Sequence, residues 1–218
     1  MKKNTAWLCS GLFLALFALI TVLLKTVDLG IAGESGTTVG FSALNDAFHR
    51  FTGVHWSWYD LTQVTGYLSI AFGGVAGLFA LRQLIVRKSL RLVDRSYYVF
   101  GGLCALLGGL YVLFEKVIVN YRPVLMPGET LPEASFPSSH TLLSVSVGGA
   151  LAILLGDALR RKDAPHRGLL RAARLTVLLL AVITPLGRLF SGAHWLTDIL
   201  ASLALSAALL FAFRALTK

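Results

Sequence analysis

Charged residues are scarce in this chain. Asp, Glu, Lys and Arg together account for 14% of its 218 residues, whereas 56% are hydrophobic, and the mean hydropathy is +0.71. Soluble domains usually carry about 25% charged residues, so this composition excludes an ordinary soluble globular domain. The chain is instead predicted to be an integral membrane protein.

Cysteine is also rare, since Cys9 and Cys104 are the only two in the chain. Both fall inside apolar stretches, and their spacing matches neither a disulfide framework nor a zinc motif. We therefore interpret them as packing residues.

Six stretches are apolar and long enough to cross a bilayer, which takes about 20 helical residues. They span residues 5–24, 58–81, 97–119, 139–156, 173–190 and 195–214. They leave no room for a soluble domain, so we expect one all-α membrane domain over residues 1–218, a six-transmembrane-helix bundle. The basic, apolar start resembles a secretory signal, but no small-residue cleavage site follows it, which favours a retained first helix.

Basic residues gather on one side of this predicted topology. The net charge is +9, and 15 of the 20 Lys and Arg residues lie in segments that share one side if the six spans alternate: 2–3, 82–95, 160–174 and 214–218. The positive-inside rule makes that side, and both termini, cytoplasmic. This distribution argues against nucleic acid as a partner and for membrane lipids.

The other five basic residues fall on the outer side: Lys25, Arg50, Lys116, Arg122 and Arg188. Lys25 and Arg50 fit a snorkelling side chain and an interfacial charge, but the other three need another explanation. Between the first two spans, residues 26–57 predict a loop followed by a helix in the membrane interface. His49 and His55 lie there, and we interpret them as interfacial residues without a catalytic role.

Three outer segments carry residues typical of an anion site. They are the end of the third span, the start of the fourth and the short connection after the fifth, with Lys116, Arg122, Ser138, Ser139, His140, Arg188, His194 and Asp198. Cations, hydroxyl groups and the free amides of a helix N-terminus together favour a multiply charged oxyanion. Phosphate is the obvious candidate.

The two histidines of this set add chemistry to binding. His194 and Asp198 are four residues apart and share one helix face, so the aspartate is expected to accept from one ring nitrogen and leave the other free as nucleophile or base. His140 is expected to be a general acid. The cations would stabilise the charge that a metal otherwise stabilises, so we expect neither a metal nor a cofactor.

Any one of these residues alone is better explained by structure, for example as an arginine paired with a buried acid or as a packed histidine. A charge at the bilayer centre costs roughly 2.5–3.5 kcal/mol on insertion scales. Eight such residues on one side therefore favour a catalytic interpretation.

The three segments resemble the signatures of the type 2 phosphatidic acid phosphatases, in the haloperoxidase-related superfamily: K-x6-R-P, P-S-G-H and S-R-x5-H-x3-D. The resemblance covers about residues 95–214. Here the first runs from Lys116 to Arg122 and Pro123, the second is Pro137-Ser138-Ser139-His140, and the third runs from Gly187 through Arg188 and His194 to Asp198.

The resemblance implies a role for each matching residue. His194 would be the nucleophile that forms a phosphohistidine, Asp198 its orienting carboxylate, and His140 the acid that protonates the leaving group. The phosphate ligands would be Lys116, Arg122, Ser138, Arg188 and the amide of Ser139.

Three positions depart from the family pattern. Five residues rather than six separate Lys116 from Arg122, Ser139 replaces glycine, and Gly187 replaces serine.

The expected function is therefore a metal-independent phosphatase, multi-pass in a bacterial inner (cytoplasmic) membrane, with its site facing the periplasm. Its substrate would be a lipid phosphate or diphosphate: undecaprenyl diphosphate, phosphatidylglycerol phosphate, phosphatidic acid or diacylglycerol diphosphate. Two alternatives stay open, a lipid phosphotransferase that uses the same histidine and a non-catalytic anion-binding transporter or scaffold. A soluble haloperoxidase is disfavoured by the membrane spans.

Overall fold

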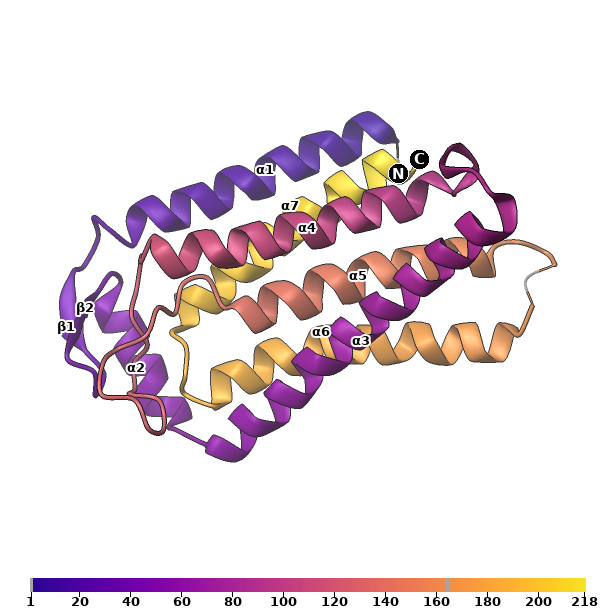
Figure 1. Cartoon of the computed structure of the whole chain (residues 1–218). Coiled ribbons are helices and arrows are strands. Elements are labelled where there is room, and N and C mark those ends of the chain that lie inside the picture. Colours follow the sequence, from indigo (N-terminus) through magenta and orange to yellow (C-terminus); the bar gives the residue numbers. More distant parts are fainter. Residues whose placement is uncertain (1, 164) are drawn as a thin grey trace.

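The computed structural model describes residues 2–163 and 165–218, and it forms an elongated helical bundle (Figure 1). Six of its helices are long and apolar enough to cross a membrane, which confirms the predicted all-α bundle of six spans. They are α1 (Lys3–Leu23), α3 (Trp56–Arg87), α4 (Arg95–Lys116), α5 (Ser139–Leu159), α6 (Arg167–Phe190) and α7 (Leu196–Thr217).

The observed helices follow the predicted spans, with the largest differences at α3 and α6. Helix α3 extends six residues beyond the predicted end at residue 81 and stops at Lys88, which adopts a left-handed conformation with φ 50°. Helix α6 begins six residues before the predicted start at residue 173. Both extensions contain basic residues, which continue a helix without belonging to its apolar span. A short 3₁₀ helix, η1 (Leu90–Leu92), joins α3 to α4.

Helices α5 and α7 form the centre of the bundle. Within their most apolar windows, 44% of α5 and 50% of α7 are buried, more than in any other spanning helix of the described chain. Small polar residues link the helices, as Ser146 Oγ lies 3.1 Å from Ser206 Oγ and Ser69 Oγ lies 3.1 Å from Ser144 Oγ. Such hydroxyl pairs are typical of packed membrane helices, where water cannot satisfy them.

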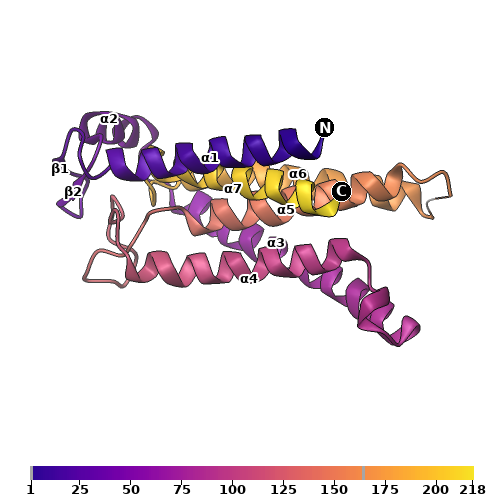
Figure 2. The same cartoon turned by 90° about the horizontal axis from the view of Figure 1, so that it is seen from above.

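Helices α1 and α4 lie at opposite edges of the bundle (Figure 2). Helix α1 packs along α7, whereas α4 makes sparse contacts with α3 and α5. The loose packing of α4 matters for the site, because it leaves space between α3, α4 and α5.

A small layer covers one end of the bundle, opposite the two termini (Figure 1). It contains α2 (Ser42–Thr52), where an interfacial helix was predicted, and a hairpin of β1 (Gly30–Ala32) and β2 (Thr37–Val39). The sequence predicted only a loop at the hairpin, because strands of three residues are too short to show an alternating pattern. Ala32 and Val39 of the hairpin pack on Trp195.

Candidate active site

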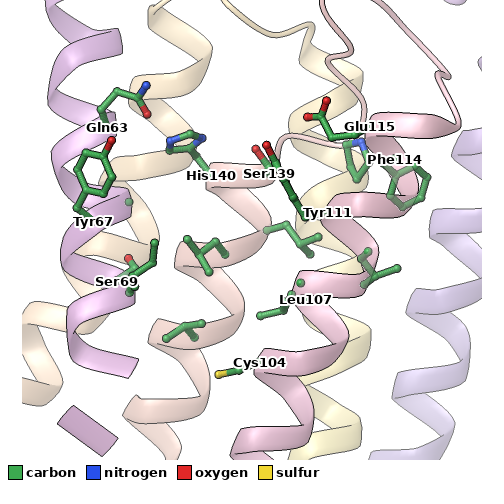
Figure 3. Close-up of a pocket in the computed structure, with 18 of the residues that line it drawn as sticks. Gln63, Tyr67, Ser69, Cys104, Leu107, Tyr111, Phe114, Glu115, Ser139 and His140 are labelled. Atoms are coloured by element: carbon green, nitrogen blue, oxygen red, sulfur yellow. The ribbon is translucent and has the colours of Figure 1, made fainter. Parts of the chain in front are cut away.

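A cavity of about 710 Å³ opens between α3, α4 and α5 and ends at the predicted site residues. Arg122, Ser139, His140 and His194 all line it. Figure 3 shows Gln63, Ser139, His140 and Glu115 at one end of this cavity and Cys104 at the other. The fold therefore brings together residues from all three sequence motifs.

His194 lies in the connection between α6 and α7 and is almost completely buried. Its Nδ1 lies 3.0 Å from the backbone carbonyl oxygen of Ser135. A carbonyl can only accept, so Nδ1 carries the hydrogen and Nε2 keeps a lone pair. Nε2 lies 3.5 Å from Nη1 of Arg122, at the cavity.

The surroundings of His194 also favour its neutral form. Burial lowers its pKa well below 6.5, and the positive charges of Arg122 and Arg188 lower it further. A neutral imidazole with a free Nε2 lone pair is the form that can attack phosphorus.

Asp198 occupies the expected face of α7 but makes different hydrogen bonds from those expected. Its Oδ2 lies 3.8 Å from His194 Nδ1 and accepts instead from the backbone N–H of Trp195, at 3.0 Å. Its Oδ1 accepts from Nδ2 of Asn120, at 3.1 Å. The ring N–H thus donates to the Ser135 carbonyl instead of to Asp198. The carboxylate caps the start of α7 and lies close enough to stabilise an imidazolium.

Arg188, near the end of α6, is completely buried. Its Nη2 donates to Oε1 of Gln63 at 3.0 Å, and its guanidinium lies 4.6 Å from the ring centroid of Tyr59. Among the residues that the structure describes, Nε and Nη1 have no hydrogen-bond partner and no carboxylate pairs with this side chain. A buried cation without a counter-charge is costly, so this position favours an anionic ligand.

Gln63 and Tyr59 were not identified from the sequence. They come from the first turns of α3, and Gln63 also donates through Nε2 to the Tyr59 hydroxyl, at 3.0 Å. The only sequence signal was a polar residue inside an apolar span, which by itself indicates no particular partner.

Arg122 reaches the cavity from the long connection between α4 and α5. Its Nε forms an ion pair with Glu133 Oε2 at 3.0 Å, and its Nη1 lies 3.3 Å from the carbonyl oxygen of Ala193. The backbone of this connection is held by the outer layer, since Ser35 Oγ donates to the Arg122 carbonyl at 2.7 Å and Lys25 Nζ donates to the Val119 carbonyl at 2.6 Å. Lys25 is therefore tied to the loop that carries Arg122, beyond the snorkelling role expected from the sequence.

His140 and Ser139 begin α5 and face the cavity. Helix α3 passes so close to His140 that a Cβ added at Gly66 would lie 2.9 Å from Cδ2 of the ring. Ser139 has no positive φ, which explains why a serine is tolerated where the family pattern has glycine.

Three expected phosphate ligands lie outside the cavity lining: Ser138, Lys116 and Arg188, of which Arg188 contacts the lining residue Gln63. Ser138 is fully buried, its Oγ donates to Thr141 Oγ1 at 3.0 Å, and its carbonyl accepts from Ser202 Oγ at 3.1 Å. Lys116 is exposed at the end of α4, while its neighbour Glu115 lines the cavity. The structure does not bring Ser138 and Lys116 to the cavity, and the roles of all three residues as ligands stay predictions.

Gly187 has a steric explanation. A Cβ at this position would lie 2.5 Å from Cγ2 of Thr62 and 3.2 Å from Cε3 of Trp58. Because α3 packs directly on this point of α6, the serine of the family pattern would not fit here.

The two outer-layer histidines lie outside the cavity lining. His49 Nε2 lies 3.2 Å from the carbonyl oxygen of Gly192, and its ring packs on Trp195. The backbone N–H of His55 donates to the Ser191 carbonyl at 3.3 Å. His49 through its side chain, and His55 through its backbone, thus contact the connection that carries His194. Across the described residues no three His, Cys, Asp or Glu side chains are grouped as metal ligands would be.

The fold and the site define a membrane-embedded helical phosphatase, and comparison with known proteins gives its family. The family model of the PAP2 superfamily matches residues 98–218, more than half of the chain, so the chain belongs to the PAP2 superfamily. It is similar in fold to a crystal structure described as the first transmembrane PAP2 type phosphatidylglycerolphosphate phosphatase from Bacillus subtilis, with 16% identity, a TM-score of 0.62 and 94% of each chain covered. The comparison with curated proteins gives no match.

Proposed function

We propose that this protein hydrolyses a lipid phosphate or lipid diphosphate through a phosphohistidine on His194, at the outer face of a bacterial cytoplasmic membrane. The observation that carries the proposal is the buried guanidinium of Arg188, whose Nε and Nη1 have no partner in the described chain. The positive charge of Arg188 also lowers the pKa of His194. A phosphate group would satisfy the arginine and present phosphorus to the histidine.

The first step is attack by His194. Its Nε2 lone pair forms a bond to phosphorus as the bond between phosphorus and the lipid oxygen breaks, and protonated His140 gives its proton to that oxygen. The ring of His194 becomes positively charged, and the Ser135 carbonyl and Asp198 on its Nδ1 side stabilise it. Arg122 and Arg188 stabilise the negative charge on the phosphoryl oxygens.

The second step returns the enzyme to its starting form. His140, now neutral, takes a proton from a water molecule whose oxygen attacks phosphorus. The bond between phosphorus and Nε2 breaks, its electron pair returns to the ring, and inorganic phosphate leaves with the water oxygen.

The rest of the cavity fits a lipid chain. Its lining below the site is mainly apolar and glycine-rich, with Leu107, Leu142 and Val147 among its residues. Cys104 and Glu115 at its two ends are eleven residues apart on α4, which is about 16 Å along a helix. Half of a bilayer core is about 15 Å thick, so the cavity has the depth of one leaflet and opens beside the loosely packed α4.

The outer-face assignment rests on the charge distribution, because the site lies at the end opposite both termini and most basic residues (Figure 1). Candidate substrates are undecaprenyl diphosphate, phosphatidic acid and diacylglycerol diphosphate, together with phosphatidylglycerol phosphate, the substrate named for the Bacillus subtilis protein.

Phosphate release from this lipid panel by detergent-purified protein tests the proposal. We expect release by the wild type that persists in EDTA, is inhibited by vanadate, and falls at least about a thousandfold in His194→Ala. His55→Ala, which removes another outer-layer histidine, should keep wild-type release. Undiminished release by His194→Ala would exclude the mechanism, and loss of activity in EDTA would exclude the metal-free reaction.

The two alternatives predict different products. A phosphotransferase would move the phosphoryl group to an added lipid acceptor instead of water, so a phosphorylated acceptor would form at the expense of free phosphate. A transporter or scaffold would bind the lipid phosphate and release no phosphate at all.

A further inference from the structure

Glu115 places a carboxylate in the same cavity as the proposed phosphate site. Among the described residues that line the cavity, it is the only acidic one and Arg122 is the only Lys or Arg. In the described part of the chain, no hydrogen bond or ion pair occupies its side chain. Figure 3 shows it at the end of the cavity that holds Ser139 and His140.

The first motif explains how an acid comes to lie here. The family pattern has six residues between its first position and the arginine, and here six residues, 116–121, lie between Glu115 and Arg122. The first position of the pattern therefore falls on Glu115 rather than on Lys116. Adjacent residues of a helix point about 100° apart, and the structure turns Glu115 to the cavity and leaves Lys116 out of its lining. The position expected to hold a cation beside the phosphate therefore holds an anion.

The cavity lining then carries one unpaired charge, which is negative. Glu133 pairs with Arg122 at 3.0 Å, which leaves Glu115 as the charge of the lining without a partner in the described chain. The buried cation Arg188 lies next to the lining, in contact with Gln63. A phosphate monoester adds one to two negative charges. Glu115 is exposed at the mouth of the cavity, and like charges repel. A substrate that brings its own positive charge therefore fits this cavity better than one that does not.

Two kinds of cation could meet the carboxylate: a divalent metal bound with the phosphate, or an ammonium group of the substrate. Glu115 belongs to no group of three metal-ligating side chains in the described residues, and a single carboxylate rarely holds a divalent ion without further protein ligands. An ammonium group needs only one carboxylate.

From these observations we infer that Glu115 is a specificity-determining residue, selecting lipid phosphates whose alcohol carries an ammonium group close to the phosphate ester. This inference rests on the proposed phosphatase function and narrows its substrate class. The phosphate meets Arg188 and His194 while the ammonium group meets Glu115, so both unpaired charges of the site are neutralised together.

The test compares a long-chain vicinal amino-alcohol phosphate with its N-acetylated counterpart, which has the same chain and phosphate but no positive charge. Wild-type protein should hydrolyse the amine with kcat/KM at least about tenfold higher, as expected for one charge-assisted hydrogen bond. Glu115→Gln should remove this preference, and Glu115→Lys should reverse it by favouring the N-acetylated lipid. Glu129→Gln, which changes an exposed carboxylate in the connection after α4 and outside the cavity lining, should keep the wild-type preference.

Other outcomes would overturn the inference. Equal rates on both lipids, or a preference that survives in Glu115→Gln, would exclude ammonium selection while leaving the phosphatase intact. A rate that rises with added Mg²⁺ in the wild type but not in Glu115→Gln would assign the carboxylate to a metal instead. Release of phosphate from no lipid at all would reject the proposed function and this inference with it.

Discussion

His194 is oriented by the backbone rather than by the side chain that its motif supplies. The Ser135 carbonyl fixes its tautomer, while Asp198 is occupied by Trp195 and Asn120. Burial lowers the pKa of the ring, and the charges of Arg122 and Arg188 lower it further, so the ring is neutral. The orientation and charge state of the proposed nucleophile thus depend on the segments that carry Ser135, Arg122 and Arg188.

The depressed pKa of His194 leads to a pH prediction. Positive charge nearby disfavours the imidazolium, so Arg122→Gln should raise the pKa of His194. The acid limb of kcat/KM, where protonation removes the nucleophile, should therefore move to higher pH in this variant, with a lower maximum because a phosphate ligand is lost. Arg50→Gln, which removes an exposed outer cation paired with Asp46, should leave the limb in place. A limb that moves to lower pH in Arg122→Gln would contradict the account.

The steric explanation of Gly187 gives a stability prediction. Gly187→Ser should lower the melting temperature, because the new Cβ meets Thr62 and overpacking typically costs about 1–3 kcal/mol. Gly168→Ser in the same helix meets no atom within 4 Å and should change the melting temperature little. A Gly187→Ser protein as stable as the wild type would show that α3 can move aside.

Among the secondary-structure elements, the β1–β2 hairpin links the outer layer to the site, as α2 does through His49. Its turn holds the Arg122 backbone through Ser35, and its strands cover Trp195, whose Nε1 donates to the Tyr121 carbonyl at 2.8 Å. An element of two short strands thereby supports both the arginine and the connection that carries the nucleophile.

This role predicts an effect of the hairpin on catalysis. Ser35→Ala should lower kcat/KM about fivefold, the value of one lost hydrogen bond of about 1 kcal/mol, with little change in melting temperature. Thr38→Ala, an exposed change on the same hairpin, should have wild-type kinetics. Wild-type kinetics in Ser35→Ala would show that the loop holds Arg122 without the hairpin.

The elements that the sequence could predict are those with a strong local signal. The length of the apolar stretches predicted the six spans, and the helical spacing of apolar residues predicted α2. The hydrogen bond of His194 to the Ser135 carbonyl depends on how the connection between α4 and α5 packs against the start of α7. No local sequence pattern predicts that packing. Gln63 and Glu115 were missed for the same reason, because the packing of α3 and α4 decides which side chains face the cavity.

In the molecule as a whole, the candidate site lies at one end of the bundle, opposite both termini. The basic residues and both termini lie at one end, and the cavity joins the site at the other end to the middle of the bundle beside α4. Under the proposed function, a lipid in one leaflet would place its chain in the cavity and its phosphate near Arg122, Arg188 and His194.

The central claim is that His194 carries the phosphoryl group during turnover, and mass spectrometry of the protein tests it most directly. Turnover of a lipid phosphate is stopped with alkali, which preserves phosphohistidine, and the peptides are analysed. The account predicts a phosphoryl group on His194 in the wild type and none in His194→Ala. Active wild-type protein that carries phosphate on another residue, or none under any quench time, would contradict it.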